Sequence, residues 1–226
     1  MADTFAPLVW DKTGEKIYET GVSNVAMYKA VNGTYPLGVA WNGVTAITES
    51  PSGAEANAVY ADNIKYANLI AAEEFGATIE ALTYPDEFAE CNGEASLVAG
   101  VSIGQQTRKP FGLAWKSLIG NDTDGTEFGY KIKLAYGLVA APSERANNTV
   151  NESPETMTMS WELKSTPVEV TGHKPTSIVT IDSSKFKTEE QKSKLAAFEK
   201  VLFGSDTANA RLPLPDEIAT LIGAAG

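Results

Sequence analysis

The chain has 226 residues, of which 43% are hydrophobic and 9% aromatic, and this composition is typical of a globular protein rather than a disordered one. It carries 18 Lys and Arg against 29 Asp and Glu, and no run approaches the ~20 apolar residues that a membrane-spanning helix needs. The net charge of −11 and the lack of a basic run argue against a nucleic-acid-binding protein.

The acidic excess is unevenly distributed. Residues 1–170 hold 11 basic and 22 acidic side chains, whereas residues 171–226 hold 7 of each. A solvated surface that keeps the protein soluble and a surface that repels phosphate explain this excess equally well. The first residues, 1–5, lack the basic and apolar regions of a signal peptide, so we expect synthesis and folding in a cytoplasm.

Cys91 is the only cysteine, which excludes an intrachain disulfide and a thiolate metal cluster. A reactive thiol needs an electropositive setting, but Glu87, Glu90 and Glu94 surround this one in sequence. We therefore predict that Cys91 is a small buried hydrophobe.

The first half of the chain reads as strands separated by turns. Residues 35–41 and 44–50 flank Asn42-Gly43, which predicts a tight hairpin. Shorter strands are predicted at 56–60 and 65–71, and another at 77–84. A short helix over 85–90 then begins at a proline and ends before Asn92-Gly93.

The clearest alternation lies between residues 111 and 163 and predicts half-buried antiparallel strands. Three strands are expected, each with one apolar face. Their apolar residues are Phe111, Leu113, Trp115 and Ile119 in the first, Phe128, Tyr130, Ile132, Leu134, Tyr136 and Leu138 in the second, and Met157, Met159, Trp161 and Leu163 in the third. Lys131 and Lys133 are expected on the opposite face of the second strand, and residues 120–125 form the turn before it.

The C-terminal part has a helical pattern. Thr188 and Gln191 match a capping box, and apolar residues at Leu195, Phe198, Val201 and Leu202 follow at helical spacing as far as Gly204. Residues 212–215 are expected to be extended and residues 216–222 to form a last short helix. We predict a mainly β fold, a β-sandwich or barrel with roughly 40% strand, one flanking helix and a short second helix.

No catalytic constellation is evident in the sequence. His173 is the only histidine and lies in a turn-like segment, so Ser–His–Asp and Cys–His chemistry is disfavoured. Residues 122–127 have a faint likeness to a calcium loop but lack its full spacing, and a plain hairpin loop is the better interpretation. We expect no enzymatic activity, no cofactor and no metal.

Two rival functions remain open. Four tryptophans could form the platform of a virion or cell-surface carbohydrate-binding module, although Trp115 and Trp161 lie on apolar strand faces where core packing is the default. A glycan-cleaving β-sandwich enzyme would need a cleft with a carboxylate whose pKa is raised.

Several segments, in the same order along the chain, resemble the major tail proteins of long-tailed bacteriophages and prophages, mainly of Gram-positive hosts. The resemblance covers about residues 21–222 and is specific in aggregate. Its segments are GVAWNG at 38–43, ESPSGAEA at 49–56, YADNIKY at 60–66, GATIEA at 76–81, YPDEFAEC at 84–91, GLAWK at 112–116, IGNDT at 119–123, GYKI at 129–132, AYG at 135–137, APSER at 141–145, NESP at 151–154, SWEL at 160–163, KPTS at 174–177 and LPLPDE at 212–217.

This resemblance implies a tail-tube fold that forms a hexameric ring. The rings of the family stack around a tape-measure protein, meet tail terminator and distal tail proteins at their ends, and conduct genomic DNA without binding it specifically. The location implied is the virion tail, assembled in the host cytoplasm, with no membrane contact. The family has no known catalytic residues, and none is carried over here.

Within a single domain over 1–226, we expect an N-terminal arm at 1–24, a β-sandwich at 25–182, a helix at 188–203 and a C-terminal extension at 204–226. The segment after the second predicted strand is too long for a tight turn and rich in small residues. As a ring-stacking loop we predict Glu49, Ser50, Pro51, Ser52, Gly53, Ala54, Glu55, Ala56 and Asn57. The alternative is a mobile surface loop without a partner.

Overall fold

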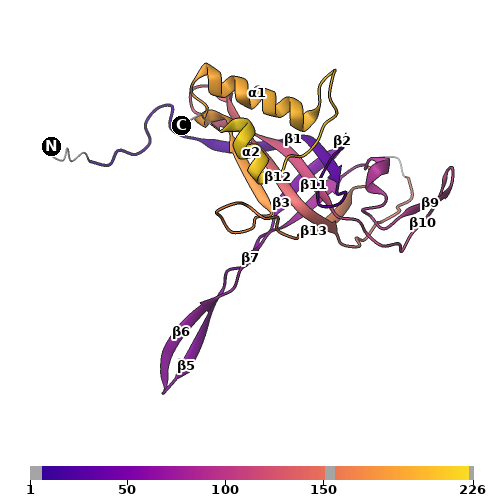
Figure 1. Cartoon of the computed structure of the whole chain (residues 1–226), viewed down its shortest axis with the longest axis horizontal. Helices are drawn as coiled ribbons and strands as arrows, with labels where there is room; N and C mark the ends of the chain where they lie inside the picture. The colour runs from indigo at the N-terminus through magenta and orange to yellow at the C-terminus, as the bar shows by residue number, and fades with distance from the viewer. Residues whose placement is uncertain (1–6, 151–155, 224–226) are drawn as a thin grey trace.

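The computed structural model describes residues 7–150 and 156–223, and strands dominate it (Figure 1). Eight strands form one large sheet in the order β2–β1–β11–β12–β13–β8–β3, with β14 beside β12. Their bounds are β1 (Tyr18–Lys29), β2 (Gly38–Ala40), β3 (Val44–Glu49), β8 (Gly76–Ala81), β11 (Phe111–Asn121), β12 (Gly125–Ala140), β13 (Met159–Ser165) and β14 (Ile178–Asp182). The prediction of a mainly β fold is confirmed.

Three two-stranded ribbons and four helical segments complete the described chain. The ribbons are β4 (Ser52–Gly53) with β7 (Glu73–Glu74), β5 (Ala56–Ala61) with β6 (Ile64–Ile70), and β9 (Ala95–Val98) with β10 (Val101–Ile103). The helical segments are the 3₁₀ helices η1 (Asp86–Phe88) and η2 (Ser183–Lys185) and the α-helices α1 (Glu189–Phe203) and α2 (Pro215–Ile222). The long helix begins as predicted, because the Thr188 side chain accepts from the Gln191 backbone N–H in a complete capping box.

The large sheet curls on itself without closing into a barrel, so the sandwich-like alternative holds and the barrel does not. Strand β12 pairs with β14 through residues 131–135 and with β13 through residues 138–140, so the sheet divides along this strand. The curl brings β3 close to β1, since Lys133 on β12 forms ion pairs with Glu19 on β1 and Glu49 on β3.

The predicted hairpin around Asn42-Gly43 is wrong. Strand β2 pairs with β1, whereas β3 pairs with β8 at the other end of the strand order. Trp41 explains this crossing: its side chain is buried, and its indole N–H donates to the Thr83 carbonyl at 2.8 Å. Trp41 therefore anchors the connection in the core, and the exposed residues Asn42 and Gly43 lead from it to a strand at the other end of the strand order.

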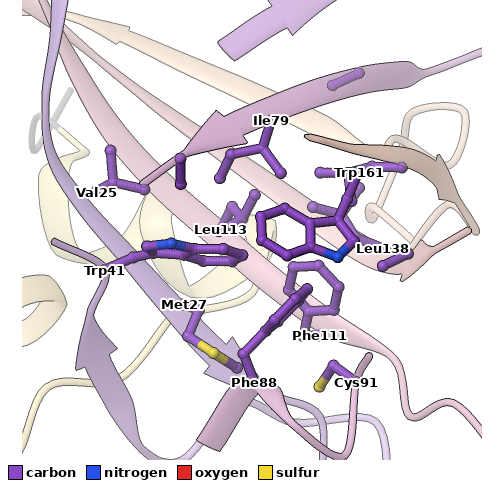
Figure 2. Packing of buried hydrophobic residues seen from close by; sticks show 14 of the residues in the cluster. Val25, Met27, Trp41, Ile79, Phe88, Cys91, Phe111, Leu113, Leu138 and Trp161 are labelled. Carbon is purple, nitrogen blue, oxygen red and sulfur yellow. The ribbon is translucent and has the colours of Figure 1, made fainter. Parts of the chain in front are cut away.

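Apolar side chains form one cluster on each side of the central strands. Within the curl, Trp161 packs edge to face against Trp41 and Phe88, whose own rings are tilted to each other, and the ring centroids of the three lie 4.4–5.7 Å apart (Figure 2). On the other side, α1 contributes Leu195, Phe198 and Leu202 to a second cluster. Cys91 is fully buried at the first cluster, as predicted (Figure 2).

Leu138 does not share a face with the other apolar residues predicted for its strand. Ile132, Leu134 and Tyr136 face the helices, but Leu138 belongs to the cluster within the curl. Gly137, between them, has a φ of +60° and marks a shift in the register with β11, so the alternation reverses at this bulge. A Cβ at Gly137 would lie 2.1 Å from the Thr166 carbonyl oxygen, so no other residue fits there without movement.

Candidate assembly surface

Among the described residues, the candidate chemical groups do not come together in a site. His173 lies in an exposed turn, and burial raises the pKa of the Cys91 thiol to about 11, which keeps it protonated. Asp122 accepts from the Gly14 backbone N–H at 2.9 Å, so the loop at 122–127 serves as a hairpin turn that holds the N-terminal segment. Over residues 7–150 and 156–223, no group of three or more His, Cys, Asp or Glu side chains could hold a metal ion.

None of the described helices has the length and apolar character needed to cross a membrane.

The most conspicuous surface is a long hairpin, residues 50–75, that extends away from the rest of the molecule (Figure 1). Its stem is β4 paired with β7, and its blade is β5 paired with β6. Asp62 and Asn63 join the blade strands, both with positive φ, and these are the residue types that tolerate such a two-residue turn. The Ser50 backbone N–H donates to the Gly76 carbonyl oxygen at 2.8 Å, and this hydrogen bond connects the stem to the large sheet.

The stem depends on a glycine at its narrowest point. Gly53 has a φ of +83°, and a Cβ there would lie 2.2 Å from the Ala72 carbonyl oxygen. Only glycine allows the two stem strands to approach so closely, so this residue sets the path of the long hairpin.

The register of the blade divides its side chains into two faces. Cross-strand partners share a face and residues alternate along each strand. One face, called here the apolar face, consists of Val59, Ala61, Ile64, Ala67 and Leu69, with Asn57 at its base. The other face includes Ala58, Tyr60, Lys65, Asn68 and Ile70. Ile64 and Leu69 are 63% and 62% exposed, so in the described chain the apolar face is largely uncovered.

Charged side chains fix the root of the long hairpin. Glu49, the last residue of β3, accepts from Lys133 Nζ at 2.6 Å, and Lys133 also lies 3.4 Å from Glu19. Burial lowers the pKa of Lys133, but hydrogen bonds and attraction from Glu49 and Glu19 outweigh it and raise that pKa above its ordinary value. Ion pairs therefore hold the root of the long hairpin, whereas the two blade strands pair only with each other within the described chain.

The predicted stacking loop, Glu49–Asn57, falls in three different elements. Glu49 ends β3, Ser52 and Gly53 form β4, and Ala56 and Asn57 begin β5. The segment is therefore one strand of a paired hairpin rather than a loop. The predicted stacking segment leaves out the tip and the second strand of this hairpin, although strands are predicted at 56–60 and 65–71 and Asp62-Asn63 between them are residue types that tolerate positive φ.

The predicted N-terminal arm also overlaps the sheet. Strand β1 begins at Tyr18, which pairs with Gly120, so residues 18–24 belong to the sheet and residues 7–17 lie outside it. Residues 1–6 of the predicted arm lie outside the described residues.

A groove of about 620 Å³ lies at the root of the long hairpin. Its lining includes Ser50, Glu74, Glu144 and Lys164, and Phe75 is its single aromatic side chain. Trp41, Trp115 and Trp161 are all buried. These tryptophans therefore form no exposed platform of the kind that the carbohydrate-binding alternative requires.

No family model matches the sequence, and no curated protein matches it. Among solved structures, the chain is similar to a chain of "Cryo-EM structure of the anti-feeding prophage (AFP) baseplate, 6-fold symmetrised", with a TM-score of 0.38 and 8% sequence identity. The match covers 80% of this chain and 99% of that chain.

Proposed function

We propose that this chain is a structural protein of a bacteriophage virion that forms hexameric rings, stacked into the tail tube of a long non-contractile tail. The long hairpin carries the proposal, and the segment-by-segment resemblance to major tail proteins supports it. The proposed role is assembly, without enzymatic activity or cofactor.

The long hairpin needs a partner on physical grounds. An isolated two-stranded ribbon is marginally stable in water, and a contiguous exposed apolar face marks an interaction site. The described part of the chain leaves the apolar face open, with Ile64 and Leu69 exposed. A partner that buries this face would order the blade and cover its apolar area.

A further copy of the same chain is the proposed partner. In the proposed contact, the long hairpin of one copy packs on a different surface of the next copy, and such a heterologous contact repeats into rings or open filaments. Stacked rings give a tube whose lumen would contain the tape-measure protein and later conduct DNA, with tail terminator and distal tail proteins at the ends. The net charge of −11 per chain suits a conduit that does not retain phosphate.

Two neighbouring residues of β6 provide a matched test. Leu69 lies on the apolar face and Asn68 on the other, and both are exposed, so neither substitution should alter the monomer fold. We expect Leu69→Asp to abolish tubes in negative-stain micrographs, because it would bury a carboxylate in the contact. Asn68→Asp adds the same charge and should assemble normally, with unchanged thermal melting for both variants.

Normal tubes from Leu69→Asp would refute the role of the apolar face. Equal loss of tubes from both variants would show that added charge alone, rather than the face, controls assembly. A protein that stays monomeric and is retained on a glycan column would support the carbohydrate-binding module instead.

A further inference from the structure

A second hairpin also stands away from the body of the molecule. It consists of β9 and β10, called here the short hairpin, and it carries no charged residue (Figure 1). Leu97 and Val98 on β9 and Val101 and Ile103 on β10 are all exposed, Leu97 to 66%. The two strands pair only with each other, so each has one free backbone edge within the described chain.

A groove of about 470 Å³ separates the short hairpin from the segment around η1. Its lining comprises Tyr84, Asp86, Ala89, Glu94, Ala95, Ser96, Gly100, Val101 and Ser102. Its walls thus combine one aromatic ring and small aliphatic side chains with two serines and two carboxylates, of which Glu94 also accepts from Asn92 Nδ2 at 2.7 Å. Such a hollow suits a large apolar side chain that carries one hydrogen-bond donor.

The N-terminal segment of the chain supplies a side chain of that kind. Trp10 is 74% exposed, and Leu8 and Val9 beside it are exposed too. The segment is tethered behind Trp10, because Asp122 accepts from the Gly14 N–H and the Asn121 side chain donates to the Gly14 carbonyl at 3.2 Å. Residues 7–10 are uncharged and outside regular structure, so they present an apolar strip next to the tether at Gly14.

The two surfaces lie at opposite ends of the longest axis of the molecule (Figure 1). One copy therefore cannot join its own N-terminal segment to its own short hairpin. A head-to-tail neighbour satisfies both surfaces at once, and the same contact recurs in every copy of a closed ring. Residues 7–10 and the short hairpin carry no charge. The charges at this contact are the carboxylates of Asp86 and Glu94 in the groove, and a hydrogen-bond donor on the docked side chain would offset part of the cost of burying them.

We infer that Trp10 of one copy docks in the groove beside the short hairpin of a second copy, with residues 7–10 lying along the free edge of that hairpin. The indole N–H would donate to the carboxylate of Asp86 or Glu94, and added-strand pairing would satisfy the backbone. This contact is lateral, between neighbours within a ring, and is separate from the apolar face of the long hairpin. It rests on the proposed self-assembly.

Mixed single-cysteine variants test the inference. In a Cys91→Ala background, Val9→Cys is mixed with Val101→Cys under mild oxidation, and a disulfide dimer should form in the mixture and not in either variant alone. A mixture of Val9→Cys with Tyr66→Cys, on the long hairpin, should give none. In the unmodified protein, assembly should also protect Trp10 from acrylamide, because the other three tryptophans are already buried.

Val101→Glu should restore the quenching of Trp10 by acrylamide. Because position 101 then carries Glu, the disulfide test uses Leu97→Cys in its place, and Val101→Glu should reduce the disulfide yield between Val9→Cys and Leu97→Cys several-fold. Rings that form without any disulfide between Val9→Cys and Val101→Cys would overturn the inference and leave the proposed tube intact. Absence of any assembly at every concentration would overturn the inference and the proposed function together.

Discussion

Trp161 connects three parts of the fold through one side chain. It lies on β13, it packs edge to face against Trp41 and Phe88, and its indole N–H donates to the Asn92 side chain at 3.0 Å. One set of contacts therefore joins β13 to the connection between β2 and β3, which carries Trp41, and to η1 and the loop after it (Figure 2). At 1% exposure, Trp161 has no surface to offer a sugar.

Trp161→Ala should lower the free energy of unfolding by ~3–5 kcal/mol, because it leaves a large cavity and removes the indole donor from the Asn92 side-chain oxygen. Chemical denaturation of the monomer measures this loss. Trp10→Ala is the control: Trp10 is largely exposed in the single chain, so its replacement should change monomer stability by less than about 0.5 kcal/mol. A free energy of unfolding for Trp161→Ala within error of that of the parent would contradict the burial of Trp161.

Glu19 gives the fold an acid-sensitive contact. Burial raises its pKa, but hydrogen bonds from Lys131 and Ser117 and the charge of Lys133 outweigh this effect and lower the pKa to about 2. Lys131 Nζ and Ser117 Oγ each lie 2.6 Å from a Glu19 oxygen. Because the folded-state pKa lies below the ordinary value of 4.5, the ionised group stabilises the fold above that pH.

This stabilisation should disappear as the pH falls from 4.5 towards 2, the range between the two pKa values. Glu19→Gln should therefore destabilise the protein at neutral pH and differ less and less from the parent as the solution is acidified. Denaturation curves at several pH values measure the difference. Glu80→Gln, on an exposed side chain of β8, should show no such trend, and a constant deficit for Glu19→Gln would argue against an ionised Glu19 in the folded protein.

At the scale of elements, local patterns were sufficient where one short signal decides the structure. The capping box at Thr188 predicts the start of α1, and the alternation around Trp161 predicts β13, because each depends on residues close in sequence. The crossing at Trp41 and the reversal at Gly137 depend on partners 16 or more residues away, namely Val25 and Thr166. Sequence spacing carries no information about such contacts.

The long hairpin illustrates the same limit at a candidate site. The two short strands were predicted, yet their pairing with each other and the extension of the stem away from the sheet were not. The composition of residues 49–57 indicated a long connection but not its direction. The direction follows from Gly53 and from the Lys133–Glu49 ion pair at the root, which only the folded arrangement brings together.

At the scale of the whole molecule, a curled sheet backed by two helices supports three projections. The N-terminal segment and the short hairpin leave at opposite ends of the long axis, and the long hairpin leaves in a third direction (Figure 1). Two opposed surfaces suit contacts around a ring, and the third suits contacts along a tube. The proposed hexamer therefore assigns a contact to each exposed apolar region that stands off the body.

Electron microscopy of the concentrated, unmodified protein tests whether the chain assembles into a tube. Face-on class averages should show six-fold rings with an open central channel, and side views should show those rings stacked into tubes of constant width. Particles that remain single subunits, close with another symmetry or lack a channel would contradict the account.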